Sequence, residues 1–203
     1  YRNPLLLAKT AASLDKISNG RFTLGAGTGY LKSEFHALGV DFDERNELFD
    51  EALDVLPLHW SGASFSYTGK HFSARDVMAR PRPVQNPIPI WLGGNATLTL
   101  KRVAARAQGW MPLLGSAVQA ATTRTAHLES LESVKERIAL LHELAGERAA
   151  SIDIVMSYHE DLRTDVERHR DAALGQRRRD RLGDGKAGGP RRELLHGAVG
   201  EGQ

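Results

Sequence analysis

The sequence predicts an α/β fold built on a parallel sheet or barrel. Two patterns lead to this expectation. Short strand-like segments alternate with longer segments of helical apolar periodicity, and runs of glycine follow the strand-like segments directly. The chain has 203 residues, of which 41% are hydrophobic and only 6% aromatic, so a single sizeable core is the default organisation.

The first predicted element is a helix, followed by a strand and a glycine loop. Asn3 is a good cap, Pro4 is tolerated in a first helical turn, and Asn19-Gly20 ends the helix. Residues 21–26 have strand character, and a short helix is expected over 31–38. The face of the first helix that we expect to be buried consists of Leu7, Ala11, Leu14 and Ile17.

A second amphipathic helix is expected to begin near Asp43. Pro57 lies inside it, and because proline lacks the N–H donor and clashes with the preceding turn, we expect a kink or an early end before Trp60. Its apolar stripe is Leu48, Phe49, Ala52, Leu53, Val55 and Leu56. Its acidic residues should form a solvated face: Asp43, Glu44, Glu47, Asp50 and Glu51.

The middle of the chain predicts a small hairpin and then two further strands. The hairpin is an insertion near 61–75, with its turn at Thr68-Gly69-Lys70. The proline-rich stretch 80–89 should run extended into a strand over 90–92. Gly93-Gly94 ends that strand, Asn95 is expected to cap a helix to about 107, and 110–114 is the next strand candidate.

The last predicted elements are a helix and a buried strand. The helix carries Leu131, Val134, Ile138, Leu141 and Leu144 and ends at Gly146, and the strand covers 152–156. Beyond it, residues 161–203 are rich in Gly and Arg and contain no aromatic residue. We therefore expect two parts: a partial (β/α) barrel over 1–160 and a disordered or poorly packed basic tail over 161–203.

Composition removes several function classes. With no cysteine there is no disulfide framework, no cysteine nucleophile and no thiolate metal site, and the eight histidines show no ligand spacing, so we expect no metal. The tail from 163 carries 10 Lys/Arg against 7 Asp/Glu, which leaves 17 against 18 in the body, so a nucleic-acid surface is not expected. The absence of a long apolar segment or a signal-like start favours a cytoplasmic protein without a membrane contact.

The sharpest local signal is the run Leu24-Gly25-Ala26-Gly27-Thr28-Gly29-Tyr30. Glycines permit a tight turn and let backbone N–H groups approach an anionic group, as in phosphate-binding loops. The spacing is not that of a dinucleotide fingerprint, because Tyr30 stands where a third glycine is needed. An S-adenosylmethionine-dependent methyltransferase loop remains an alternative, although Thr23 stands where such a loop usually has an acid. Glycines that serve only as turn formers are a further alternative.

A collinear set of motifs resembles the bacterial luciferase-like monooxygenase family, in particular its deazaflavin-dependent members. The resemblance covers about residues 1–158 and departs from the family at Pro57. The motifs are Asn3 to Lys9, Leu14 to Phe22, Leu24 to Tyr30, Glu34-Phe35, Leu38-Gly39, Asp43 to Arg45, Phe49 to Leu53, Pro81 to Gln85, Pro89 to Asn95, and Gly109-Trp110.

The resemblance implies a (β/α)8 TIM barrel that is incomplete here, with the first three strands and the last strand missing. It implies a cofactor at the carboxyl ends of the strands. Coenzyme F420, a deazaflavin, is the preferred cofactor and FMN the alternative, with hydride transfer or oxygen activation at the cofactor ring. The cofactor-binding residues carried over are Gly27, Thr28, Gly29, Ser33, Gly93, Gly94 and Asn95, with Glu34 near the loop.

The resemblance also implies a small-molecule substrate and a homodimer. The catalytic residues stay unknown, because the family has them in the missing strands. Trp91 and Trp110 fill the barrel wall or border the substrate pocket. The third interpretation of the chain, beside oxidoreductase and methyltransferase, is a non-catalytic barrel fragment.

Overall fold

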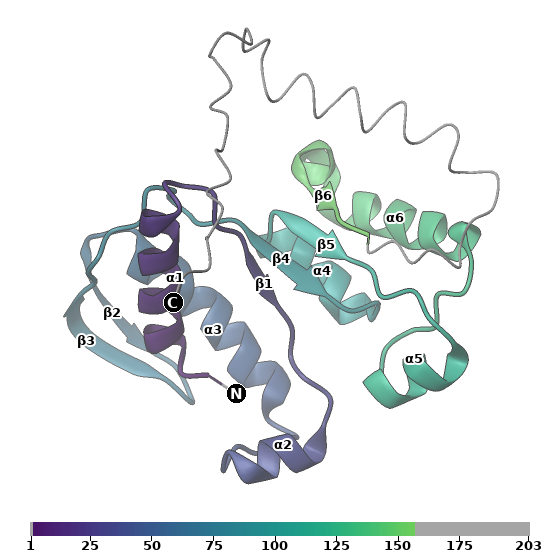
Figure 1. Ribbon diagram of the computed structural model, residues 1–203, viewed down its shortest axis with the longest axis horizontal. Coiled ribbons are helices and arrows are strands. Elements are labelled where there is room, and N and C mark those ends of the chain that lie inside the picture. The colour runs from purple at the N-terminus through teal and green to yellow at the C-terminus, as the bar shows by residue number, and fades with distance from the viewer. Residues whose placement is uncertain (1, 157–203) are drawn as a thin grey trace, which may run out of the picture. The chain divides into compact units, whose positions relative to one another are not determined.

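The computed structural model describes residues 2–156 and has an α/β fold around a four-stranded parallel sheet (Figure 1). The strand order is β1-β4-β5-β6, and every neighbouring pair is parallel, which confirms the predicted class. The predicted tail over 161–203 lies outside the described residues. The strands of the sheet are β1 (Leu24–Ala26), β4 (Ile90–Gly93), β5 (Gly109–Met111) and β6 (Asp153–Ile154).

Helices lie between successive strands of the sheet, and a further helix precedes the first strand. All four predicted longer helices are present, whereas the short α5 was not predicted. A 3-10 turn over Gly146–Ser151 leads into β6. The helices are α1 (Pro4–Ile17), α2 (Lys32–Ala37), α3 (Arg45–Trp60), α4 (Thr97–Arg106), α5 (Ala117–Thr123) and α6 (Leu131–Ala145).

Helix α1 begins as predicted but buries a different face. The Asn3 side chain accepts hydrogen bonds from the backbone N–H groups of Leu5 and Leu6, at 3.0 and 3.4 Å. Ala11 is buried and Leu7 packs against the core as expected, but Leu14 and Ile17 are 44% and 83% exposed, so the expected apolar face is wrong at these two positions. The helix instead packs against α3 through a face of small residues, which lets the two helices approach closely. The buried residues of α1 are Pro4, Ala8, Ala11, Ala12 and Asp15.

Helix α3 continues through Pro57 to Trp60, so the expected early end is wrong. Pro57 is exposed, and its missing N–H costs the helix one hydrogen bond. The residues after it compensate, because Trp60 is fully buried and its indole nitrogen donates to the Ala8 carbonyl of α1 at 3.0 Å. Tertiary packing of the last turn therefore outweighs the local effect of the proline.

The hairpin pairs β2 (Ser64–Thr68) with β3 (Ser73–Met78) in antiparallel fashion, and β3 extends beyond the stretch predicted for it. Its turn is fixed to α3 by Glu51, whose carboxylate accepts the backbone N–H groups of Lys70, His71 and Phe72 at 2.8 to 3.1 Å. Asp50, on the same helix, pairs with Arg102 of α4. The acidic residues of α3 thus bind neighbouring elements, and the expectation of a merely solvated face is wrong for these two.

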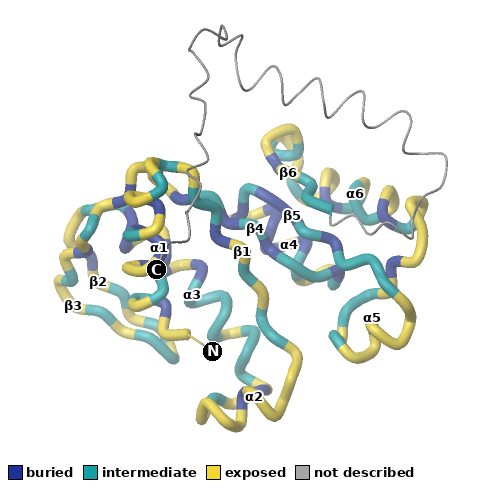
Figure 2. The backbone as a smooth tube through the Cα atoms, viewed as in Figure 1, coloured by how far each residue is buried: buried dark blue, intermediate teal, exposed yellow. Residues whose placement is uncertain are grey.

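The core lies between the helices and one face of the sheet (Figure 2). Because side chains alternate along a strand, Leu24, Ile90, Leu92 and Trp110 point together into this core. The alternate positions belong to the opposite face of the sheet, which carries glycine at several of them. That contrast between the two faces positions the candidate site.

Candidate functional site

The two glycine loops singled out in the sequence lie side by side at the carboxyl ends of β1 and β4. Ala26 pairs with Leu92, so Gly27 and Gly93 continue the two strands next to one another. A Cβ atom at Gly27 would have one neighbour within 4 Å, the Gly93 carbonyl oxygen at 4.0 Å. The backbone at this edge is therefore open to close approach by a ligand.

The first loop turns sharply after β1 and leads to α2. Gly29 has a φ of +82°, a conformation that side chains other than glycine rarely adopt. Gly27 and Thr28 line a cavity beside β1, whereas Ser33 lies exposed in the first turn of α2. Glu34 is also exposed in this short helix. The structure thus groups Gly27 and Thr28 with Gly93, and places Ser33 beyond the loop.

The second loop is organised by hydrogen bonds within the chain. Gly94 has a φ of +113°, and its N–H donates to the Met111 carbonyl at 3.3 Å. The Asn95 N–H donates to the Thr125 hydroxyl at 2.6 Å, and Asn95 is fully buried. Its side-chain amide donates to the carbonyls of Leu113 and Ala126 at 2.7 and 2.8 Å, and its oxygen accepts the Leu113 N–H at 2.8 Å.

Asn95 therefore holds the 113–126 segment against the end of β4. It does not cap α4, because that helix begins at Thr97 and has Ala96 at its cap position without a side-chain hydrogen bond. The expected cap is wrong because the buried amide satisfies distant backbone groups instead. Thr125, thirty residues away in sequence, was missed, and no local pattern could have linked it to this loop.

The two strand tryptophans point to opposite faces of the sheet. Trp110 is fully buried in the core, and its indole nitrogen donates to the Gly94 carbonyl at 2.8 Å. Trp91 lies on the other face over Gly109, where a Cβ atom would be 2.3 Å from the Trp91 ring. Met111 shares this face, since its Cε lies 3.4 Å from the position of a Cβ at Gly25. Only Trp91, of the two, is placed on the face that could border a substrate.

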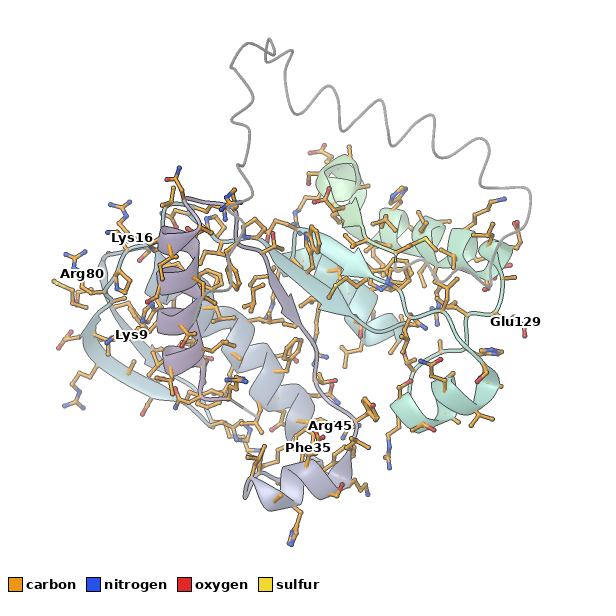
Figure 3. All side chains as sticks on the ribbon, viewed as in Figure 1. Lys9, Lys16, Phe35, Arg45, Arg80 and Glu129 are labelled. Carbon is orange, nitrogen blue, oxygen red and sulfur yellow. The ribbon has the colours of Figure 1, made fainter. Side chains whose placement is uncertain are left out.

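A cavity of about 460 Å³ lies between α1, β1 and α3. At one end of it Arg45 stacks on the Phe42 ring, with its guanidinium carbon 3.8 Å from the ring centroid, and Phe35 meets the same ring edge-on at 5.2 Å. Figure 3 shows Arg45 and Phe35 at this corner between α2 and α3. Apart from Arg2, Asn3, Thr28 and Arg45, the lining consists of apolar residues and glycines.

The titratable groups of the described chain gather elsewhere, between α3 and the hairpin. Glu44, Glu47 and His71 bring three possible ligand atoms within 4.8 Å of one another. The Lys70 ammonium already lies 3.2 Å from Glu44 and 2.7 Å from Glu47, and hydrogen bonds from Lys70 and His71 lower the pKa of Glu47. This cluster is an ion-pair network that ties the hairpin to the helix.

Across residues 2–156, none of the helices has both the length and the apolar character needed to cross a bilayer.

Comparison with known proteins gives a consistent family. The family model described as luciferase-like monooxygenase matches residues 1–193. An uncharacterized protein of Mycobacterium tuberculosis is 37% identical over 110 residues, which are 54% of this chain and 38% of that protein. The FMNH(2)-dependent dimethylsulfone monooxygenase of Pseudomonas putida is 29% identical over 120 residues, which are 58% of this chain and 33% of the enzyme.

Solved structures give the same picture. A monooxygenase from Streptomyces bottropensis is 26% identical with a TM-score of 0.64, over 88% of this chain and 53% of that one. The coenzyme F420 dependent tetrahydromethanopterin reductase from Methanopyrus kandleri shares the fold at 22% identity, with a TM-score of 0.60 over 76% of this chain and 46% of the reductase. The chain thus spans about half or less of the length of the proteins it matches.

Proposed function

Because the chain belongs to the luciferase-like monooxygenase family, we propose that it forms the cofactor-binding part of a flavin- or deazaflavin-dependent oxidoreductase. The cofactor is coenzyme F420, with FMN as the alternative, and the substrate is a small molecule. The four parallel strands are part of a (β/α)8 barrel that further strands complete. Family membership gives no support to the methyltransferase interpretation of the glycine loop.

The observation that carries the proposal is the meeting of the two glycine loops. In parallel α/β proteins, ligands bind at the carboxyl ends of the strands, and Gly27 and Gly93 meet at that end of β1 and β4. A Cβ atom at Gly27 would have only the Gly93 carbonyl oxygen within 4 Å, so a ligand can approach the backbone here without meeting long side chains. A non-catalytic role would require no such opening.

The residues that would hold the cofactor are those of the first loop. Gly27, Thr28 and Gly29 offer backbone N–H groups and one hydroxyl, and Ser33 offers a second hydroxyl nearby in sequence. Gly93 contributes space, whereas the N–H groups of Gly94 and Asn95 already bond Met111 and Thr125. Asn95 therefore supports the site by holding its neighbouring segment.

The protein's contribution is placement. A bound flavin or deazaflavin supplies hydride transfer or oxygen activation, and the chain positions it and limits the access of water. Neither a metal nor a nucleic acid takes part in the proposed reaction. The assembly we propose is a homodimer, as the resemblance implies, in the cytoplasm.

The test is a fluorescence titration with F420, with FMN in parallel, of the wild-type protein and of Gly27→Val. The Cβ atom of the valine meets one backbone atom, the Gly93 carbonyl oxygen at 4.0 Å, so we expect the substitution to leave the fold intact and to occupy the open space. We expect saturable binding by the wild-type protein and at least about tenfold weaker binding by the variant. Lys101→Ala, an exposed change on α4, is the matched control. Equal affinity of wild-type and Gly27→Val proteins would refute the role of the loop.

A further inference from the structure

Three cationic side chains gather around the ring of Phe42. The Arg45 guanidinium carbon lies 3.8 Å from the ring centroid, that of Arg124 lies 4.9 Å from it, and the Lys32 ammonium lies 5.2 Å from it. We call Lys32, Arg45 and Arg124 the cationic cluster. Its members come from α2, from the start of α3 and from the residue that ends α5, so only the folded chain brings them together.

The cationic cluster has no carboxylate partner within the described chain. The Arg45 guanidinium donates to the Phe42 carbonyl at 2.8 Å, which leaves further N–H groups on it. One cation is enough for a cation–π contact, and like charges placed around one ring repel one another, so a bound anion would stabilise the arrangement. The ion pairs of residues 2–156 all involve other cations, namely Lys70, His71, Arg102, Arg106, His127 and Lys135.

Two members of the cluster lie next to the first glycine loop. Lys32 follows Gly29 by three residues, and three residues span at most about 11 Å. Arg45, labelled in Figure 3, lines the same cavity as Thr28 of that loop. An anionic group that extends from a ligand at this loop is therefore within reach of both charges.

The third member, Arg124, is connected to the second glycine loop. The next residue, Thr125, accepts the N–H of Asn95 through its hydroxyl at 2.6 Å. Arg124 itself has a φ of +54° and a ψ of +41°, in the left-handed region that residues other than glycine, asparagine and aspartate rarely adopt. Backbone strain of this kind is concentrated at ligand-binding and active sites, so it supports a binding role for the arginine.

We propose that the cationic cluster binds the glutamate chain of coenzyme F420 and so favours this cofactor over FMN. The inference rests on the proposed function, because it needs a cofactor at the glycine loops. FMN ends at its phosphate, whereas F420 carries beyond its phosphate a chain of glutamate residues, each with a free carboxylate. Arginine and lysine pair with carboxylates, and three cations from three separate elements suit a chain of carboxylates better than a single phosphate.

Two other roles for the cluster fit less well. A purely structural role would need one cation on Phe42, and the two exposed members, Lys32 and Arg124, would add only repulsion. A nucleic-acid site would need a longer row of basic residues, since affinity depends on the number of phosphates contacted. The first 162 residues carry 17 Lys/Arg against 18 Asp/Glu, so the cluster is a local feature of a nearly neutral body.

The experiment titrates the whole chain with F420 that carries several glutamates, with the same cofactor without glutamates, and with FMN, by isothermal titration calorimetry. We expect the form with glutamates to bind at least about tenfold more tightly than the form without them. Because the contacts lie at the surface, about 0.5 M NaCl should remove most of this difference.

The double variant Lys32→Gln/Arg124→Gln removes the two exposed charges of the cluster. It should weaken binding of the form with glutamates about tenfold or more, and change the affinities for the form without glutamates and for FMN by less than about twofold. Retained binding of these two ligands shows that the variant is folded. Lys16→Gln/Lys101→Gln makes the same change in net charge at exposed positions and, as the matched control, should leave all three affinities unchanged.

Failure of this inference is distinguishable from failure of the proposed function. Equal affinity of the wild-type protein for the two forms of F420 would overturn the glutamate-chain site and leave the cofactor site at the glycine loops standing. An equal loss of affinity of the double variant for FMN and for F420 with glutamates would also overturn it, because the cluster would then hold the phosphate. Binding of none of the three ligands would overturn the proposed function and this inference with it.

Discussion

Asp15 joins two distant sequence motifs, and its substitution by Asn should destabilise the protein substantially. The carboxylate is fully buried. One oxygen accepts the backbone N–H groups of Val84 and Gln85 at 2.8 and 2.9 Å, and the other accepts the Gln85 side-chain amide at 2.7 Å. These bonds tie the end of α1 to the segment that leads into β4.

The magnitude follows from the hydrogen-bonding capacity of each side chain. Asparagine can keep one oxygen towards the two backbone donors, but its NH₂ group would then face the Gln85 amide, which is itself a donor. That amide also donates to the Phe22 carbonyl, so it cannot turn without losing a second bond. The charge-assisted bond from the Gln85 side chain is lost, and the two bonds from the Val84 and Gln85 backbone become bonds to a neutral oxygen. The new NH₂ group is also a buried donor without an acceptor. Together these changes should lower the free energy of unfolding by about 3 kcal/mol.

The assay is urea denaturation of Asp15→Asn and wild-type proteins at several pH values. Burial alone would raise the pKa of Asp15, but the hydrogen bonds from Gln85 and Val84 outweigh it and lower the pKa below 3.8. Because the folded state holds this proton less tightly than the unfolded state, the stabilisation is present above about pH 4 and is lost as the pH falls through the folded-state pKa. The difference between the two proteins should therefore shrink in acid.

Asp43→Asn, on an exposed residue, is the matched control and should change stability by less than about 0.5 kcal/mol. A cost for Asp15→Asn no larger than that of the control would refute this account of the carboxylate. A cost that stays constant down to pH 2 would contradict the assigned ionisation.

Three further predictions concern the helices. Arg102→Met removes a bidentate ion pair to Asp50, in which both hydrogen bonds are 2.8 Å long. The free energy of unfolding measured in urea should fall by about 2 kcal/mol, and solvent screening keeps this figure low because Asp50 is more than a third exposed. Trp60→Phe loses the indole hydrogen bond to the α1 backbone and part of a buried ring, so its thermal midpoint should fall by an amount equivalent to about 2 kcal/mol. Burial lowers the pKa of His59 below 6.5, and the nearby charge of Lys9 lowers it further. Because the unfolded state then binds this proton more readily than the folded state, the folded state is most stable above pH 6.5 and loses stability as the pH falls. His59→Phe should flatten the pH dependence of the thermal midpoint between pH 7 and 5, whereas an unchanged profile would contradict the assignment.

The elements with strong local signals could be predicted from the sequence. Asn3 and the Asn19-Gly20 pair bracket α1, and Gly146 ends α6, because caps and positive φ angles depend on neighbouring residues. The glycine loops were also predicted, since a ligand or a neighbouring strand can come close to the backbone only where no Cβ atom is present. Their meeting at one edge follows from parallel strand order.

The errors have a common cause in long-range packing. Helix α1 has apolar residues on two sides, and periodicity alone could not show that the alanines, rather than Leu14 and Ile17, face α3. Helix α3 continues beyond Pro57 because Trp60 in its last turn is buried and donates a hydrogen bond to the carbonyl of Ala8, 52 positions away in sequence. Asn95 and Thr125 meet only after folding, so the role of Asn95 in holding 113–126 has no sequence signal.

Parallel isothermal titrations of the purified protein with F420, FMN and S-adenosylmethionine would show whether the chain holds a flavin-type cofactor at the glycine loops. We expect saturable binding of F420, weaker binding of FMN, and no heat of binding with S-adenosylmethionine. Selective binding of S-adenosylmethionine, or binding of none of the three by a protein that melts cooperatively, would show that the glycine loops do not hold a flavin-type cofactor.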